Sequence, residues 1–516
     1  MKKIKLFRDR VAKVSTAVLV LFAMLFSGCE DYLDVNDDPD AILDNPGVFL
    51  LPSIEISLAS AIGGTFALHG SLWAQYYNQN NTANQYRTII DMDMRSDDGD
   101  NMWVELYSSA LSDIQKLKEY SMATETYNPR LNLIAVVLES YTFQIVFDAF
   151  GQAPYVDAFK GETEANFNPK FDKGEDVYPL LVDAIDEALT LYNEFNPDGT
   201  SALSTLVLTE RDKDYIFQGD IDAWVAMANS VKLKLAMRNL DFDQTWAMSV
   251  INEVEAENNY LTSDAMLDIF EAETNKENPL FAQDQNLNTT INLVADRTLS
   301  EFWSNNGDPR EPLTYQSNSA GDLLLDHGDH KALTATNPPN SNRIPILDAT
   351  RPVYLFTTSE VDFFRAELVA RGLVTGNAQA LYNSAVASAF ARVGASATDA
   401  MNNFLAAGMP YEFSATQADQ LRDIGVQKWA AMANVNPFEG FLEVNRMDYP
   451  PIEPTTTYDA APPAGNAGAK LYLPKNTVLG TDYIRRYLLP ESESVANSNF
   501  PSAQTLASDK LWWDVN

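Results

Sequence analysis

Aromatic and amide side chains are concentrated in one stretch of this 516-residue chain, from Trp73 to Arg87. Aromatic faces can stack on the C–H surface of a sugar, and planar amide or guanidinium groups can bond its hydroxyls. Peptide ligands use the same groups, so the stretch predicts a site for a glycan or a peptide. The candidate ligand residues here are Trp73, Tyr77, Asn80, Asn81, Tyr86 and Arg87.

The aromatic residues of this stretch also fit a structural interpretation. Trp73, Tyr76 and Tyr77 are spaced i, i+3, i+4, which places them on one face of a helix. A stripe of this kind packs into a core as readily as it binds a ligand, so both interpretations stay open for Trp73. The polar candidates that follow lie in an irregular segment, where a binding role is favoured.

A second candidate region holds Gln285, Asn288 and Trp303. The segment from Gln283 to Asn288 combines amides with a following tryptophan, as a sugar site requires. The alternative is a mobile loop followed by a tryptophan that packs in the core. The sequence alone favours neither enough to exclude the other.

Motifs for catalysis are missing from the sequence. There is no G-x-S-x-G elbow, H-E-x-x-H helix, phosphate loop or cysteine nucleophile. A glycosidase needs two carboxylates at a set separation, but acidic residues are too numerous for any pair to be informative. His327 and His330 could hold a metal, although such a Gly/Asp loop is more often solvated. We therefore expect binding without catalysis, and no metal or cofactor.

The N-terminus has the layout of a secretory signal. A basic region precedes an apolar run from Val14 to Phe26, and Ser27-Gly28 then leads to Cys29, the only cysteine of the chain. This arrangement resembles a bacterial lipobox. We expect residues 1–28 to be a signal peptide and Cys29 to be the lipidated first residue of the mature protein. No later segment has 18 consecutive apolar residues, so the lipid is the only expected membrane anchor.

Charge narrows the range of partners. The whole chain has a net charge of −36; removal of residues 1–28 takes away six basic residues and Asp9, which leaves −41. Such a surface repels nucleic acid and anionic lipid headgroups. It does not identify a ligand, because a solvated acidic surface is common.

Helical periodicity dominates the mature sequence, which predicts an all-α fold. The apolar spacing predicts amphipathic helices, with Asp172 as a possible N-cap of one and Gly151 ending another. Two of them look like an antiparallel pair of the tetratricopeptide kind, although no strict 34-residue repeat is visible. The helices are expected at residues 131–150, 175–192, 221–238, 359–371 and 378–392.

Composition divides the remainder of the chain into parts. Residues 29–46 are polar and acidic and predict a lipidated tether. Residues 47–516 predict a single domain. Within it, residues 47–260 and 351–450 are expected to form the helical scaffold, whereas residues 261–350 and 451–516 are expected to be rich in loops.

Several motifs, in order along nearly the whole chain, resemble the SusD/RagB-like outer-membrane nutrient-binding lipoproteins of Bacteroidetes. The resemblance is to the branch described as starch-binding and outer-membrane-associating. Most of these motifs have structural explanations, such as helix capping by Asp220 and charge pairing by Arg238 near a buried Trp224. The matching segments are Phe150–Tyr155, Phe171–Ala188, Asp214–Arg238, Asp308–Arg310, Glu360–Gly372, Gln427–Pro450 and Arg485–Glu491.

The resemblance implies a helical core of tetratricopeptide-like units with a looped insertion that carries the ligand site. It places ligand contacts before the helix at Trp103–Tyr107 and upstream of Asp308-Pro309-Arg310, where both candidate regions lie. It implies a cell-surface lipoprotein that covers a SusC-like TonB-dependent transporter in the outer membrane. Glu30-Asp31, directly after Cys29, resembles the acidic surface-export signal of that phylum.

Overall fold

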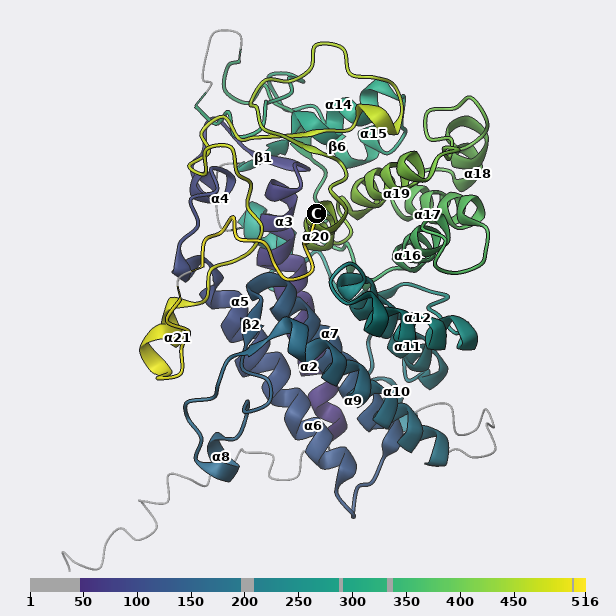
Figure 1. Cartoon of the computed structure of the whole chain (residues 1–516). Helices are drawn as coiled ribbons and strands as arrows, with labels where there is room; N and C mark the ends of the chain where they lie inside the picture. The colour runs from purple at the N-terminus through teal and green to yellow at the C-terminus, as the bar shows by residue number, and fades with distance from the viewer. Residues whose placement is uncertain (1–46, 196–207, 287–290, 332–336, 504) are drawn as a thin grey trace, which may run out of the picture. The chain divides into compact units, whose positions relative to one another are not determined.

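Helices form most of the described protein, and the predicted all-α, tetratricopeptide-like fold is confirmed (Figure 1). The predicted signal peptide, Cys29 and the tether lie outside the described residues, and so does Asn288. Residues Gly47–Asn516 form one unit. The structure, a computed structural model, describes residues 47–195, 208–286, 291–331, 337–503 and 505–516.

The longer helices carry the scaffold, and short helical turns connect them. The longer helices are α2 (Leu50–Ala61), α3 (Ala67–Trp73), α6 (Ser112–Met122), α7 (Pro129–Phe150), α9 (Gly174–Phe195), α11 (Ile221–Asn239), α12 (Gln244–Glu257), α14 (Arg297–Asn305), α16 (Thr358–Ala370), α17 (Ala378–Arg392), α19 (Gln417–Met432) and α20 (Pro437–Met447). The shorter helices are α4 (Arg87–Ile90), α5 (Asp100–Val104), α8 (Gly161–Glu164), α10 (Leu208–Arg211), α13 (Pro279–Phe281), α15 (Glu311–Thr314), α18 (Ala397–Asp399) and α21 (Glu491–Ala496). The 3₁₀ and π-helical turns are η1 (Gly47–Phe49), η2 (Ile62–Phe66), η3 (Ser96–Gly99), η4 (Glu105–Leu111), η5 (Ala282–Asn286), η6 (Ala400–Phe404) and η7 (Asn466–Gly468).

The five helices expected from periodicity are present as α7, α9, α11, α16 and α17. Helix α7 begins after Asn128, whose side chain accepts a hydrogen bond from the Leu131 amide, and ends at Gly151 with φ of 76°. Helix α11 begins after Asp220, whose side chain accepts hydrogen bonds from the amides of Asp222 and Ala223, as expected of a cap. Local capping therefore explains why these helices begin and end where they do.

Asp172 does not have the expected capping role. Helix α9 begins at Gly174, two residues later. The Asp172 carboxylate instead accepts hydrogen bonds from the amides of Tyr155 and Val156, at 3.0 and 2.8 Å. These hydrogen bonds hold Asp172 against the segment that directly follows α7. A local capping pattern in the sequence does not reveal such a tertiary contact.

Helices that follow one another along the chain pack together in pairs. The pairs are α6 with α7, α11 with α12, α16 with α17, and α19 with α20, and α7 also packs on α9 and α11. Buried alanines in α17, such as Ala385 and Ala389, permit its close approach to α16. Figure 1 shows the loop-rich segments around β1, β6, α14 and α15 gathered at one end of these helices.

The strands are short and form two-stranded ladders. They are β1 (Tyr77–Gln79), β2 (Gln152–Ala153), β3 (Asp172–Lys173), β4 (Ala265–Leu267), β5 (Leu293–Ala295), β6 (Tyr315–Gln316), β7 (Ile344–Pro345), β8 (Val353–Phe356), β9 (Ile452–Glu453) and β10 (Leu471–Tyr472). The pairs β1–β5, β2–β3, β4–β8 and β6–β7 are antiparallel, and β9–β10 is parallel. These ladders join loop segments that are far apart in the sequence.

Within the part of the chain that the structure describes, two helical stretches are long and apolar enough to cross a membrane. They are Gly47–Trp73, with 27 residues, and Pro129–Phe150, with 22. In the folded unit, 67% and 100% of their most apolar windows are buried. Burial of this kind is typical of the core helices of a globular protein.

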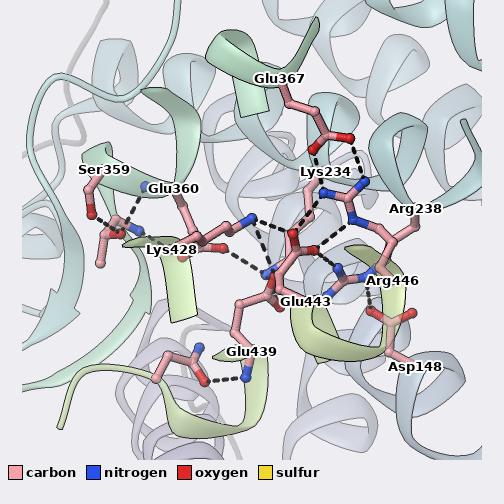
Figure 2. Close-up of polar contacts among 12 residues, drawn as sticks. Asp148, Lys234, Arg238, Ser359, Glu360, Glu367, Lys428, Glu439, Glu443 and Arg446 are labelled. Atoms are coloured by element: carbon pink, nitrogen blue, oxygen red, sulfur yellow. Dashed lines mark hydrogen bonds and ion pairs between the residues drawn. The ribbon is translucent and has the colours of Figure 1, made fainter. Parts of the chain in front are cut away.

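A network of buried charges joins five helices at the centre of the scaffold (Figure 2). The Arg238 guanidinium of α11 bonds Asp148 of α7 at 2.9 Å and Glu439 of α20 at 2.8 Å. Arg446 of α20 bonds Glu367 of α16 at 2.5 Å. The network contains the carboxylates Asp148, Glu360, Glu367, Glu439 and Glu443 and the cations Lys234, Arg238, Lys428 and Arg446.

The surrounding charges decide how these carboxyl groups titrate. Burial raises the pKa of Glu367, but the charges of Arg446 and Arg371 outweigh burial and hold the pKa below its ordinary value. For Glu360, burial raises the pKa, and the charge of Lys234 offsets only part of that rise. Buried charges are stable only when they are paired, so the network fixes the relative positions of the five helices.

Helix α20 also positions α3, which leads into the first candidate stretch. A Cβ on Gly70 would lie 2.4 Å from the backbone nitrogen of Phe438, so α3 and α20 are in direct backbone contact. The Tyr76 hydroxyl donates to the Trp429 carbonyl at 2.6 Å, and the Trp429 indole donates to the Ala74 carbonyl at 2.8 Å. The scaffold therefore fixes the point where β1 begins.

Candidate functional site

The β1–β5 ladder brings the two predicted ligand regions together. Tyr77 pairs with Ala295, and Gln79 pairs with Leu293. Beyond the ladder, the Asn80 amide donates to the Asn292 carbonyl at 2.7 Å, and its side chain donates to the Ile291 carbonyl at 2.8 Å. The residues on either side of Asn80 are thus held against the segment that follows η5.

Gln79 organises the turn that carries the first group of polar candidates. Its side-chain oxygen accepts a hydrogen bond from the Tyr86 amide at 2.6 Å, and its side-chain nitrogen donates to the Asn80 and Asn292 carbonyls at 3.2 Å. Gln79 has no solvent exposure. Gln79 was not among the predicted ligand residues, because only the long-range pairing shows that one amide closes both the turn and the ladder.

Trp73 lies in the core, with no solvent exposure. Its indole nitrogen donates to the Ile89 carbonyl at 3.1 Å, and its ring packs 5.0 Å from the rings of Phe441 and Tyr487. Tyr77 is also buried, and its hydroxyl donates to the Asn434 side chain. The structural interpretation of the aromatic stripe therefore describes Trp73 and Tyr77, neither of which presents a ring face to solvent.

Trp303 is similarly enclosed, at 1% exposure. Its ring lies 6.2 Å from that of Tyr315, and the Arg310 guanidinium lies 5.3 Å from its ring centre. Its partner candidate Gln285 is exposed and donates to the Asp284 carboxylate at 2.7 Å. The structure therefore separates the second candidate region into an exposed amide segment and a packed tryptophan.

Exposed amide side chains remain where the two regions meet. Tyr86 is buried, and the charge of Asp284 contributes to its raised pKa. The Gln79 side chain bonds both the Tyr86 amide and the Asn292 carbonyl, which ties the turn before α4 to the segment that follows η5. Asn80 and Asn81 are buried, and the Asn80 side-chain oxygen accepts a hydrogen bond from the Thr82 amide within the turn. We name one set the amide surface; it consists of the half-buried Arg87 and the exposed amides Asn84, Gln85, Gln285 and Asn286.

Arg87 is the one cation of the amide surface, and it is half-buried. Its Nε donates to the Ala83 carbonyl at 3.1 Å. Within the described ranges, no carboxylate lies close enough to form an ion pair with it. The terminal nitrogens of its guanidinium are therefore suited to bind hydroxyl or carbonyl oxygens of a ligand.

Burial is the main cause of the raised pKa values of Tyr86 and Asp284, which lie next to residues of the amide surface. Burial raises the pKa of the Tyr86 hydroxyl, and the charge of Asp284 raises it further. Burial also raises the pKa of Asp284, to about 6, and hydrogen bonds from Gln285 and from the Leu293 and Asn292 backbone offset only part of the rise. Arg87 is thus the one cation among these five residues, while Asn286 Nδ2 donates to the Glu277 carboxylate at 3.0 Å and the Asp284 carboxyl group is buried next to Gln285.

The two histidines of the Asp326–His330 loop are buried, whereas a solvated loop was expected. His327 Nδ1 lies 2.7 Å from Asp296 Oδ2, and His330 Nε2 lies 2.8 Å from Asp91 Oδ1. The expectation was wrong because tertiary contacts bring two carboxylates to this loop, from Asp296 directly before α14 and from Asp91 directly after α4. Among the described residues, no group of three His, Cys, Asp or Glu side chains is arranged to hold a metal.

The geometry suits recognition by hydrogen bonds. Amides both donate and accept, and a guanidinium donates in a fixed plane, which matches ligands with many hydroxyl or amide groups. The predicted tryptophans do not supply a stacking platform here, since both are packed in the core. A ligand on this surface would therefore be held mainly by polar contacts.

Comparisons with known proteins agree with this architecture. The sequence model of the SusD-like family, described as starch-binding and associating with the outer membrane, matches residues 39–466. No curated protein sequence matches the chain.

Solved structures share the fold at low sequence identity. A chitin-binding protein aligns with a TM-score of 0.69 at 19% identity over 92% of this chain and 100% of its own. A SusD homologue from Bacteroides uniformis aligns with a TM-score of 0.68 at 20% identity, covering 91% and 99%. A chitin-binding SusD homologue from Flavobacterium johnsoniae gives 0.66 at 16% identity, covering 91% and 98%.

Proposed function

We propose a function in glycan capture, on the premise that this chain belongs to the SusD-like family of starch-binding proteins that associate with the outer membrane. In this proposal the protein binds an oligosaccharide at the cell surface and delivers it to a SusC-like TonB-dependent transporter. It breaks no bond in the ligand.

The observation that carries the proposal is the meeting of two distant loops at the β1–β5 ladder. Gln85 and Arg87 come from the segment between β1 and the start of α4, and Gln285 and Asn286 come from η5. Sugar hydroxyls can both donate to and accept from such amides. Exposed contacts of this kind give modest affinity because water competes for each of them, and modest affinity suits a protein that must release its ligand.

The anchor and the partner belong to the same proposal. Lipidation of Cys29 would hold the protein on the outer membrane, and residues 29–46 would act as a linker between the lipid and the folded domain, which could then lie above a transporter. The chitin-binding relatives support a glycan over a peptide as the ligand class. The strongly acidic composition is consistent with the absence of nucleic acid among its partners.

Affinity electrophoresis through gels that each contain one polysaccharide tests the proposal. We expect retardation by at least one glycan, such as soluble starch or a soluble chitin derivative, with no new reducing ends after incubation. New reducing ends would contradict a binding function and support a glycoside hydrolase. If no glycan retards the protein, a peptide panel measured by calorimetry would decide whether the alternative, a peptide-binding lid, is correct.

A matched control distinguishes the amide surface from the general polarity of the protein. Asn402 is an exposed amide in η6, on a different part of the fold. We expect Asn402→Ala to migrate as the wild type does in every gel. Equal loss of retardation in Asn402→Ala and Gln85→Ala would remove the amide surface from the proposal.

A further inference from the structure

Asp284 is a buried carboxyl group in η5, directly before two residues of the amide surface. Its side chain is 1% exposed, whereas Gln285 and Asn286 are exposed. Oδ2 accepts a hydrogen bond from Gln285 Nε2 at 2.7 Å. Oδ1 is buried and has no close hydrogen-bond partner among the described residues, although the backbone of Asn292 and Leu293 lies near enough to lower the pKa of the group. A carboxylate in this position is poorly compensated for its loss of water.

The groups that face Asp284 do not stabilise its charge well. Tyr77 of β1 and Tyr86 before α4 are buried phenols, and the pKa of each is raised first by burial and also by the Asp284 charge. Arg351 acts on Tyr77 and is not among the groups that lower the pKa of Asp284. The polar groups that do lower it, Gln285 and the backbone of residues 292–293, are all uncharged.

We propose that Asp284 is a pH-sensitive latch that positions Gln285 and Asn286, with η5 packed most firmly when the carboxyl group is protonated. Ionisation weakens the packed form because it places a charge in a buried setting that contains only uncharged partners and leaves one oxygen without a close donor. When η5 opens locally, water solvates the carboxylate and the cost disappears. The latch rests on the proposed function only in its consequence, namely that these two residues contact the ligand.

The direction of the pH effect follows from proton linkage. The pKa of Asp284 is about 6 in the packed form, against an ordinary value of 3.8 that applies when the group is solvated. Protonation of Asp284 therefore stabilises the packed form fully below pH 3.8, and this stabilisation is lost as the pH rises through about 6. Two pKa units correspond to about a hundredfold change in the ratio of packed to open forms.

Hydrogen exchange measures this ratio without any ligand. In the wild-type protein, we expect the protection factors of the amides of η5 and of Leu293, after correction for intrinsic exchange, to fall by up to about a hundredfold between pH 4 and pH 7. Amides in α11, distant along the chain, serve as the internal reference. Protection factors that are independent of pH in η5 would overturn the proposal.

Substitution gives a second measurement. Asp284→Asn removes the ionisation and keeps the shape, so we expect slower exchange of η5 than in the wild type at pH 7.5 and equal exchange at pH 4. Asp423→Asn is the matched control, since Asp423 is also 1% exposed and burial raises its pKa, but it lies in α19. Faster exchange of η5 in Asp284→Asn at pH 7.5 would contradict the latch.

The ligand result separates the latch from the proposed function. If a glycan is retained, soluble starch included, we expect Asp284→Asn to bind at pH 7.5 at least as tightly as the wild type. If no glycan is retained but exchange follows the pattern above, the glycan proposal fails and the latch stands. If exchange is independent of Asp284 while glycan is retained, the latch fails and the function stands.

Discussion

Arg238 and Asp148 form a buried ion pair between α11 and α7, with Nε 2.9 Å from Oδ2 and no solvent exposure of either side chain. The same guanidinium reaches Glu439 and Glu443 of α20. One side chain thus connects three helices, and α20 in turn contacts α3, which leads to the amide surface. The position of the candidate site therefore depends on charge pairing in the scaffold.

Replacement of Arg238 by methionine should destabilise the protein strongly. Arg238→Met leaves Asp148, Glu439 and Glu443 with fewer counter-charges in a buried setting, which typically costs about 3–5 kcal/mol. The free energy of unfolding from urea titration at pH 7 measures the effect. Arg95→Met is the control, because the Arg95 pairs are exposed and their removal should leave the urea midpoint unchanged. Equal midpoints for Arg238→Met and the wild type would contradict the structural role of the network.

Acid should weaken the network through Glu367. The charges of Arg446 and Arg371 lower its pKa below the ordinary value of 4.5 in the folded protein. A carboxyl group with a lowered pKa contributes stability that is present above 4.5 and lost as the pH falls through the folded pKa. We expect Glu367→Gln to be less stable than the wild type at pH 6, and the difference to shrink at pH 3. Urea midpoints at both pH values measure it, and a constant difference would show that ionisation of Glu367 does not matter.

The contact between α3 and α20 should not tolerate a side chain at Gly70. A methyl group there would meet the backbone of Phe438 at 2.4 Å, and backbone cannot move aside as a side chain can. We expect Gly70→Ala to cost roughly 1–3 kcal/mol of stability. Gly161→Ala is the comparison, since its nearest neighbour is the movable Phe167 side chain at 3.2 Å. A melting temperature of Gly70→Ala equal to that of Gly161→Ala would contradict the close approach.

The helical scaffold follows from the sequence because its determinants are local. The 3.6-residue period, Asp220 as a cap and Gly151 as a stop all act within one turn of the helix that they define. Asp172 shows where local information ends. Its spacing from Glu175 fits a helix cap, but in the folded protein its carboxylate accepts hydrogen bonds from the amides of Tyr155 and Val156, which lie 16 to 17 residues earlier in the chain.

The candidate site could be predicted only in part. The sequence indicates the segments that carry Asn80 and Gln285, because runs of amides outside periodic helices are visible in it. It could not decide whether Trp73 and Trp303 face solvent, since that depends on partners such as Tyr487 and Tyr315, which are distant in the sequence. Gln79 and Asp284 were missed for the same reason, because only the β1–β5 ladder gives them their roles.

The most direct test of glycan capture is a calorimetric titration with an oligosaccharide of the polysaccharide that retards the protein in gels. We compare the wild type with the double variant Gln85→Ala/Gln285→Ala, which removes one exposed amide from each loop. With about 1 kcal/mol lost per hydrogen-bonding side chain, we expect roughly 10- to 30-fold weaker binding at an unchanged melting temperature. Binding of the double variant with wild-type affinity would contradict the assignment of ligand capture to the amide surface.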